Sequence, residues 1–309
     1  MNLITMGQRG ALILATALLG AACSPANNTN ESSANPTSQT LPAGNIDDAR
    51  INNAASEPGN WLAHGLDYRE QRFSPLTQIN RDTVTKLGLA YELDVGSNDA
   101  LEATPIVVDN TLFFTSTYSV VHAVDAVSGE ELWRYDPQVP KEFLRKACCG
   151  PINRGVSVYQ GNVYVATLDG RLVAVKASNG EKVWEVDTVI DRDRFYTITG
   201  APKTAKGKVF IGNGGAEFGV RGYVTAYDAA TGEQIWRFYT VPGDPSLPFE
   251  HPEMELAATT WKGGSWWEVG GGGTVWNSIV YDPEFDQAYL GVGNRAPWTR
   301  VIRSPGGGD

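Results

Sequence analysis

Three stretches of the chain repeat one pattern: Ala123-Val-Asp-Ala-Val-Ser-Gly-Glu-Glu-Leu-Trp133, Ala174-Val-Lys-Ala-Ser-Asn-Gly-Glu-Lys-Val-Trp184 and Ala226-Tyr-Asp-Ala-Ala-Thr-Gly-Glu-Gln-Ile-Trp236. Their tryptophans lie about 50 residues apart, a period typical of propeller blades and similar repeat units. In each stretch, alternating apolar residues lead into a turn that ends in glycine. The tryptophan belongs to the strand that follows this turn. We therefore expect strand, turn and strand in each, with the tryptophan packed between neighbouring blades.

Further strands are expected between the repeats, where paired apolar runs flank turn residues. At about 50 residues per blade, the globular part, residues 46–309, accommodates four to five blades of an all-β propeller. A propeller closes its ring to protect its strand edges, yet the sequence finishes on the loop-like Ser304-Pro-Gly-Gly-Gly-Asp309. We therefore expect the chain to be the front part of a longer protein. The expected hairpins are residues 104–115, 155–166, 201–212 and 278–291.

The N-terminal 45 residues do not have the pattern of a folded domain. Residues 1–23 combine a basic residue, an apolar run and small residues before Cys23, which resembles a bacterial lipoprotein signal whose cysteine becomes lipidated. Ordinary signal cleavage near Ala22 stays an alternative, and both predict export to the periplasm. Residues 24–45 are rich in Asn, Ser, Thr and Pro and are expected to form a flexible tether. The formal net charge of −10 argues against a nucleic-acid partner.

Two cysteines stand side by side, Cys148 and Cys149, with Arg154 shortly after them. A disulfide between neighbours closes a tight, flat ring, because adjacent Cα atoms lie only about 3.8 Å apart. Export would allow such a bond to persist. Two unpaired thiols are the alternative that the pair alone leaves open.

Together, the tryptophan repeat, the paired cysteines and several motifs resemble the quinoprotein alcohol dehydrogenases. The resemblance runs from about Trp61 to Asp309 and includes Trp61-Leu-Ala-His-Gly-Leu-Asp-Tyr-Arg and Arg72-Phe-Ser-Pro-Leu-Thr-Gln-Ile-Asn. It implies a secreted eight-bladed propeller that oxidises primary alcohols to aldehydes with pyrroloquinoline quinone (PQQ) and a metal ion. Electrons would pass to a cytochrome c or to a haem c domain, but the Cys-x-x-Cys-His motif that announces such a domain does not occur in this sequence.

By this resemblance, the cofactor lies between a Cys148–Cys149 disulfide ring on one face and Trp276 on the other. Arg154 is expected at the quinone oxygens, where a fixed guanidinium favours the reduced form. The glycine-rich stretch at residues 212–219 is not a dinucleotide loop, because a strand rather than a helix follows it. The remaining cofactor contacts implied by the resemblance are Glu102, Thr199, Gly214, Gly215 and Ala216.

The resemblance also implies a metal site. Glu217 would supply a carboxylate and Asn294 an amide carbonyl, and the quinone would add its own oxygen and nitrogen atoms. Such hard donors suit Ca²⁺, while a lanthanide stays open, because the residue that would decide between them lies beyond the sequence.

The general base of this family is an aspartate in a later blade, beyond Asp309, which is itself not that residue. No catalytic residue is therefore assigned in this chain, and the 309-residue chain alone is expected to be inactive. Alcohol-dependent dye reduction by the purified chain would contradict this.

Two other functions fit parts of the sequence. A non-catalytic propeller lipoprotein that acts as a protein-binding scaffold would have the same repeat and anchor, but no need for Cys148, Cys149, Arg154, Glu217, Trp276 and Asn294 together. A quinone-dependent sugar dehydrogenase would be expected to carry membrane-spanning helices at its N-terminus.

Overall fold

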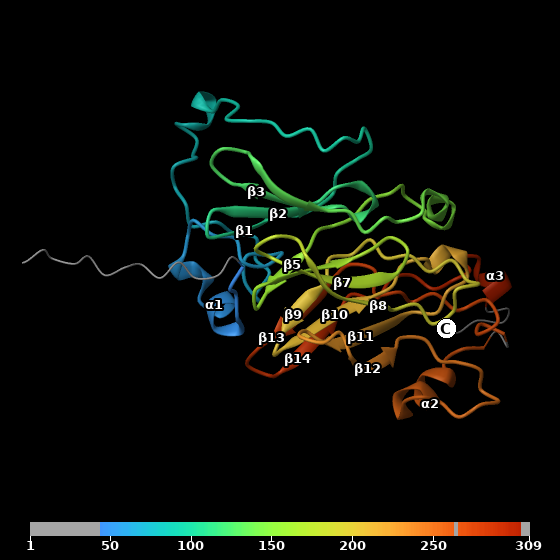
Figure 1. The fold of residues 1–309 in the computed structure, drawn as a ribbon. Coiled ribbons are helices and arrows are strands. Elements are labelled where there is room, and N and C mark those ends of the chain that lie inside the picture. The colour runs from blue at the N-terminus through green and yellow to red at the C-terminus, as the bar shows by residue number, and fades with distance from the viewer. Residues whose placement is uncertain (1–43, 263–264, 304–309) are drawn as a thin grey trace, which may run out of the picture. The chain divides into compact units, whose positions relative to one another are not determined.

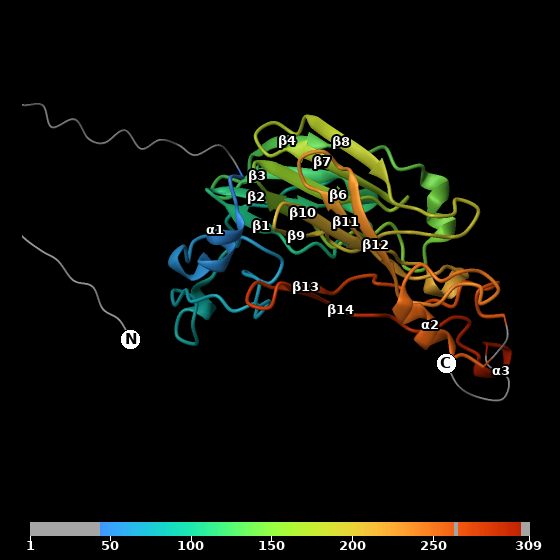
Figure 2. The same cartoon turned by 90° about the horizontal axis from the view of Figure 1, so that it is seen from below.

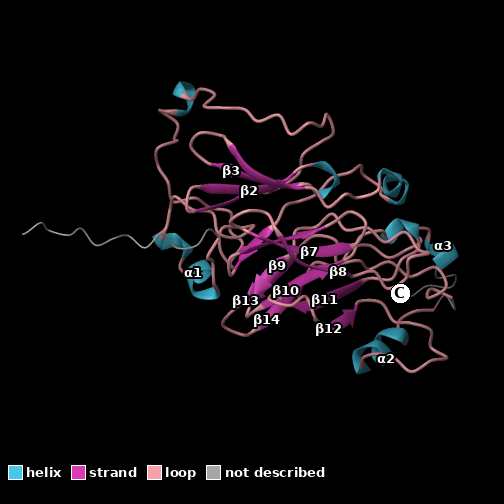
Figure 3. Cartoon of the chain, viewed as in Figure 1, coloured by secondary structure: helices cyan, strands magenta, loops and turns pink. Residues whose placement is uncertain are grey.

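Antiparallel sheets dominate the computed structural model, which describes residues 44–262 and 265–303 (Figures 1 and 3). Three sheets each contain four consecutive strands, paired in chain order, and a two-stranded hairpin follows them. The sheets are β1 (Ile106–Val108), β2 (Thr111–Thr115), β3 (Val121–Asp125) and β4 (Glu131–Tyr135); β5 (Ser157–Tyr159), β6 (Asn162–Ala166), β7 (Arg171–Lys176) and β8 (Lys182–Asp187); β9 (Lys203–Ala205), β10 (Lys208–Gly212), β11 (Tyr223–Asp228) and β12 (Gln234–Tyr239); and β13 (Ile279–Asp282) with β14 (Gln287–Leu290).

These sheets are propeller blades, and all four expected hairpins are confirmed. The described residues form three complete blades and two strands of a fourth, where the sequence predicts four to five blades. The prediction assumes that the whole globular length is built of blades, whereas residues 46–105, 240–262 and 265–278 form no strand of a sheet.

Helices are few and short (Figure 3). The α-helices of the described ranges are α1 (Asp48–Asn52), α2 (Pro252–Ala258), which follows β12, and α3 (Arg300–Arg303); the other coils in the figure are short 3₁₀ turns. Within the described residues, no helix combines the length and apolar character needed to cross a membrane. The expected signal with Cys23, and the tether up to residue 43, lie outside the described residues.

The repeated tryptophans join the blades, as the sequence predicts. The indole N–H of Trp133 donates to the carbonyl of Ala177 in the next blade at 2.9 Å, and that of Trp184 donates to Ala229 at 3.0 Å. A Cβ on the turn glycine Gly180 would lie 2.6 Å from the Trp133 ring. Each indole therefore needs a glycine in the next blade to pack against.

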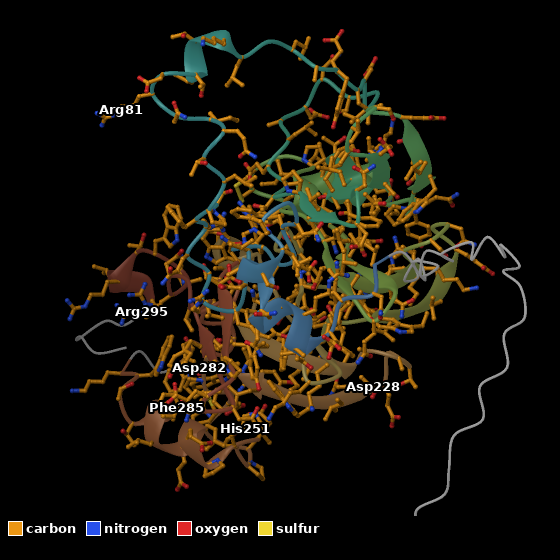
Figure 4. All side chains as sticks on the ribbon, turned by 90° about the vertical axis from the view of Figure 1, so that its left-hand side faces the viewer. Arg81, Asp228, His251, Asp282, Phe285 and Arg295 are labelled. Carbon is orange, nitrogen blue, oxygen red and sulfur yellow. A yellow bond between two sulfur atoms is a disulfide. The ribbon has the colours of Figure 1, made fainter. Side chains whose placement is uncertain are left out.

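Tyr91 makes the same contact one blade earlier, which the tryptophan pattern does not reveal. Its hydroxyl donates to the carbonyl of Ala126 at 3.2 Å, and a Cβ on Gly129 would lie 2.4 Å from its ring. The exposed stretch that contains Tyr91 thus lies beside the first blade, although it pairs with no strand in the described part of the chain. Figure 4 labels Arg81 on this stretch, where it extends away from the sheets.

The innermost strands bring the functional loops together. The first strands of successive blades, β5, β9 and β13, lie beside one another (Figures 1 and 2). Strands β6 and β7 are almost fully buried, because neighbouring blades cover both of their faces, and they read as continuous apolar runs. The outer strands β4, β8 and β12 are much more exposed. Loops that precede the inner strands therefore converge near one centre.

Candidate functional site

One cavity of about 240 Å³ brings together every predicted cofactor or metal residue except Glu102. Its walls come from the loops that precede β5, β9 and β13, from the turn after β10, and from the stretch after β14. The lining residues are Ala147, Cys148, Cys149, Ile152, Arg154, Thr197, Thr199, Gly214, Gly215, Ala216, Glu217, Thr274, Trp276 and Asn294.

A disulfide joins the neighbouring residues Cys148 and Cys149 at one side of this cavity. Both cysteines are exposed, so the ring presents apolar surface to the cavity. The pair follows a 3₁₀ turn at Lys141–Lys146 and precedes Gly150, whose φ of +90° is a conformation that favours glycine.

Arg154 is held by three side chains. Its guanidinium donates to the Thr199 hydroxyl at 2.6 Å and pairs with Glu102 at 3.0 Å. Its Cζ lies 5.0 Å from the Trp276 ring centroid, within the range of a cation–π contact. Glu102 does not line the cavity and is half-exposed, so the structure places it behind Arg154. The predicted contact of Glu102 with the cofactor stays a prediction.

Asn153, which the sequence analysis missed, fixes the loop that carries Arg154. Its side chain is buried and satisfied on every side. The amide N–H₂ donates to the Ser119 hydroxyl at 3.0 Å and to the Ala166 carbonyl at 2.8 Å. Its carbonyl accepts from the Thr115 hydroxyl at 2.9 Å and from the Gly155 N–H at 3.0 Å. Nothing in the local sequence distinguishes this asparagine from an ordinary turn residue.

Backbone hydrogen bonds tie the opposite loops to each other. The Arg154 N–H donates to the Thr199 carbonyl at 2.9 Å, and the Gly214 N–H donates to the Thr197 carbonyl at 2.7 Å. Thr197 lines the cavity and was also missed, although it stands two residues from Thr199, the spacing that places side chains on one face of an extended segment.

Gly215, Ala216 and Glu217 form a turn that points polar groups at the cavity. Gly215 has a φ of +97°, and the N–H groups of Gly215 and Ala216 make no hydrogen bond within the described part of the chain. Glu217 is exposed, and its carboxylate has no hydrogen-bond or ion-pair partner among the described residues. These groups are therefore available to a ligand.

Trp276 and Asn294 reach the cavity from adjoining stretches. The Gly273 N–H donates to the Asn294 carbonyl at 2.9 Å, and the Gly293 N–H donates to the Thr274 carbonyl at 2.8 Å. The Asn294 side-chain N–H₂ donates to the Arg295 carbonyl. The Asn294 Oδ1 accepts no hydrogen bond within the described ranges and is available to a cation.

The four glycines at residues 270–273 shape the backbone that leads to Trp276. They do not line the cavity, and all have positive φ angles between +65° and +83°. A Cβ on Gly272 would lie 2.7 Å from the Ala296 nitrogen. Glycine is needed at these positions because the backbone has left-handed φ angles and packs directly against neighbouring backbone. This backbone path positions Thr274 and Trp276, which line the cavity.

No complete protein metal site is present in the described residues. Nowhere in those ranges do three or more His, Cys, Asp or Glu side chains gather in a way that could hold an ion. Glu217 and Asn294 supply two oxygen donors, whereas Ca²⁺ takes six to eight. A metal bound here would need further oxygen or nitrogen donors from a ligand.

This geometry agrees with a comparison against protein families. Residues 61–300 match the PQQ family described as "Glucose/ethanol/alcohol dehydrogenase, beta-propeller domain". The chain belongs to this family. The match covers all the described blades and the cavity between their loops.

Relatives in the PQQ family agree in sequence and fold. The chain is 55% identical over 267 residues to quinohemoprotein alcohol dehydrogenase ADH IIB of Pseudomonas putida, covering 86% of this chain and 39% of the relative. The structure of the ADHIIG enzyme of P. putida HK5 superposes with a TM-score of 0.84 at 55% identity, over 87% of this chain and 39% of that one. A europium-containing methanol dehydrogenase gives a TM-score of 0.74 at 34% identity, over 82% and 46%.

The family match bears on one of the alternatives that the sequence left open. It favours the dehydrogenases over the non-catalytic scaffold. The chain nevertheless spans only about 39% of the length of the curated relative described above.

Proposed function

We propose that this chain binds PQQ in the cavity between the Cys148–Cys149 ring and Trp276, as part of a dehydrogenase that oxidises primary alcohols to aldehydes. The observation that carries the proposal is the convergence of a disulfide ring, an indole, a guanidinium and a free carboxylate on one cavity. Flat apolar groups suit a planar tricyclic quinone, and the polar groups suit its carboxylates and carbonyls.

Each residue has a part in holding the cofactor. The ring at Cys148–Cys149 and the indole of Trp276 provide apolar surfaces. Arg154, already fixed by Thr199 and Glu102, provides donors without having to be ordered on binding. The unpaired N–H groups of Gly215 and Ala216 provide donors for a carboxylate. When bound, PQQ would supply the oxidising chemistry, which the protein orients and tunes.

The metal proposal rests on Glu217 and Asn294. Both line the cavity, and both have an oxygen that meets no donor among the described residues. We propose Ca²⁺, with a lanthanide as the second candidate that the europium-containing relative supports. The ion would draw its remaining donors from the quinone and from water.

The rest of the proposal extends beyond the cavity. Electrons would pass to a cytochrome c or a haem domain, and the quinohemoprotein name of the relative supports this. The predicted signal at residues 1–23 would direct the protein to the periplasm, and a lipid on Cys23 would hold it at the membrane.

Calcium-dependent PQQ binding tests the proposal. We expect the purified chain to bind PQQ saturably in calorimetric titrations with Ca²⁺ present, and more weakly after chelation. The Glu217→Gln variant should lose this Ca²⁺ dependence, with an apparent Ca²⁺ affinity at least about tenfold lower, since loss of even an outer partner costs ten- to a hundredfold.

The matched control is Glu233→Gln, which changes an exposed glutamate in the turn between β11 and β12. This variant should titrate like the unmodified chain. The absence of PQQ binding to a folded chain, or equal Ca²⁺ dependence in both variants, would contradict the proposed site.

A further inference from the structure

A second cavity, of about 230 Å³, lies next to the cofactor cavity and has no part in the proposed function. The two share no lining residue, but Ala201 follows the Thr199–Gly200 wall and Asn277 follows Trp276. A Cβ on Gly200 would lie 2.6 Å from the Trp276 carbonyl, so these two walls touch. The second cavity is lined by His64, Glu70, Arg72 and Lys203, together with residues 201–202 and 277–280.

Lys203, on the inner strand β9, brings a buried ammonium to this cavity. The residue is only 7% exposed. Its Nζ pairs with Glu70 Oε1, and among the described residues neither atom has another hydrogen-bond partner. An ammonium carries three N–H donors, so hydrogens on this buried group are left without a partner in the protein. Leaving such donors unsatisfied is costly, which favours a ligand with acceptor atoms.

His64 and the exposed Arg72 add donors to the lining of this cavity. The Arg72 guanidinium donates to His64 Nδ1 at 2.8 Å. Burial, reinforced by the neighbouring cations Arg72, Lys203 and Arg154, lowers the pKa of His64 to about 4, so the ring is neutral near pH 7. A neutral ring that accepts through Nδ1 carries its proton on Nε2.

The charges of this cavity do not cancel. Lys203 and Arg72 are positive, Glu70 is negative and His64 is neutral, which leaves a net charge of +1. Burial lowers the pKa of Lys203 only to about 8, so the ammonium predominates near neutral pH. The volume exceeds the space that one water needs.

We propose that this second cavity binds a small monovalent anion, either a halide or a carboxylate such as formate, between Lys203 and the Arg72–His64 pair. An anion would accept hydrogen bonds from the buried Lys203 ammonium, which lacks further acceptors among the described residues, and would neutralise the charge of the exposed Arg72. A single excess charge disfavours a polyvalent anion.

Line broadening of the ³⁵Cl⁻ magnetic resonance signal would detect the site in the 309-residue chain without PQQ, so the result is independent of the cofactor proposal. We expect broadening that formate competes away. The double variant Lys203→Met with Glu70→Gln removes the buried pair without leaving a lone charge, and should abolish the competed broadening. Lys206→Met, at an exposed lysine on the following turn, should leave it unchanged.

Glu70→Gln alone provides a second measurement should the double variant not fold. It raises the net charge of the cavity to +2, so chloride affinity should rise at least about threefold. Bromide-soaked crystals should show an anomalous peak beside Lys203. Absence of competed broadening in the unmodified chain, or equal broadening in the folded double variant, would overturn the proposal.

Discussion

Replacing Gly272 with alanine is expected to lower the free energy of unfolding by roughly 2–5 kcal/mol, the largest effect on stability that we predict for a single methyl group. Gly272 has a φ of +73°, which costs an L-residue about 1–2 kcal/mol. The new Cβ would also lie 2.7 Å from both the Ala296 nitrogen and the Asn294 carbonyl oxygen. These are backbone atoms, so no rotamer change can relieve the overlap.

Gly207→Ala is the matched control. Gly207 has a similar φ of +69°, but nothing lies within 4 Å of its Cβ position. The free energy of unfolding of this variant should fall only by the cost of the left-handed backbone conformation, about 1–2 kcal/mol. Urea unfolding followed by circular dichroism measures both variants. Equal losses in the two would show that the neighbouring backbone yields to the methyl group.

The position of Gly272 links this loss to the cofactor site. Its N–H donates to the Val220 carbonyl at 3.0 Å, and its carbonyl accepts from Gly222 at 2.7 Å. It also bridges to Arg295 in the stretch that carries Asn294. A shift here would displace Trp276 and Asn294 together, so the variant that still folds should bind PQQ more weakly.

The architecture could be predicted from the sequence because the blade signal is local and repeated. The alanine opposite each tryptophan shows this best. Trp133 pairs with Ala123 and Trp184 with Ala174, and a register shift follows each of the two pairs. A fixed spacing of alanine, turn glycine and tryptophan therefore predicts two paired strands and the turn that joins them. Tyr91 escaped notice because a tyrosine replaces the tryptophan and no complete repeat surrounds it.

The candidate site was predictable only where a residue type is unusual in its setting. The paired cysteines are such a signal, and the structure brings them into one cavity with Trp276. Asn153 and Thr197 look ordinary in the sequence, and their roles depend on contacts between blades. The reason for the glycines at 270–273 was also out of reach, because only the fold shows which backbone they touch.

Replacing Arg154 with alanine should have the largest effect on cofactor binding, about a hundredfold loss of PQQ affinity. Lysine at this position should lose about tenfold, since it keeps the charge but cannot reach Thr199, Glu102 and the Trp276 ring together. Calorimetric titration with PQQ and Ca²⁺ measures both. Arg134→Lys, on an exposed position of β4, is the control and should bind as the unmodified chain does.

A loss of folding cannot explain this expected difference. Glu102 is half-exposed, so water can solvate its carboxylate when Arg154 is gone, and such pairs contribute about 1 kcal/mol or less. The unfolding midpoint of Arg154→Lys should therefore stay close to that of the control. A large fall in that midpoint, or PQQ affinity equal to that of the control, would contradict the assigned role of Arg154.

The same titrations decide how Glu102 acts. If it only positions Arg154, as its place outside the cavity indicates, Glu102→Gln should weaken PQQ binding by about threefold and add nothing in the Arg154→Lys background. If it contacts the cofactor directly, as the family resemblance implies, its loss should multiply with that of Arg154. Two residues that act through one contact give a coupling energy, whereas two independent contacts give additive losses, so the double variant separates these roles.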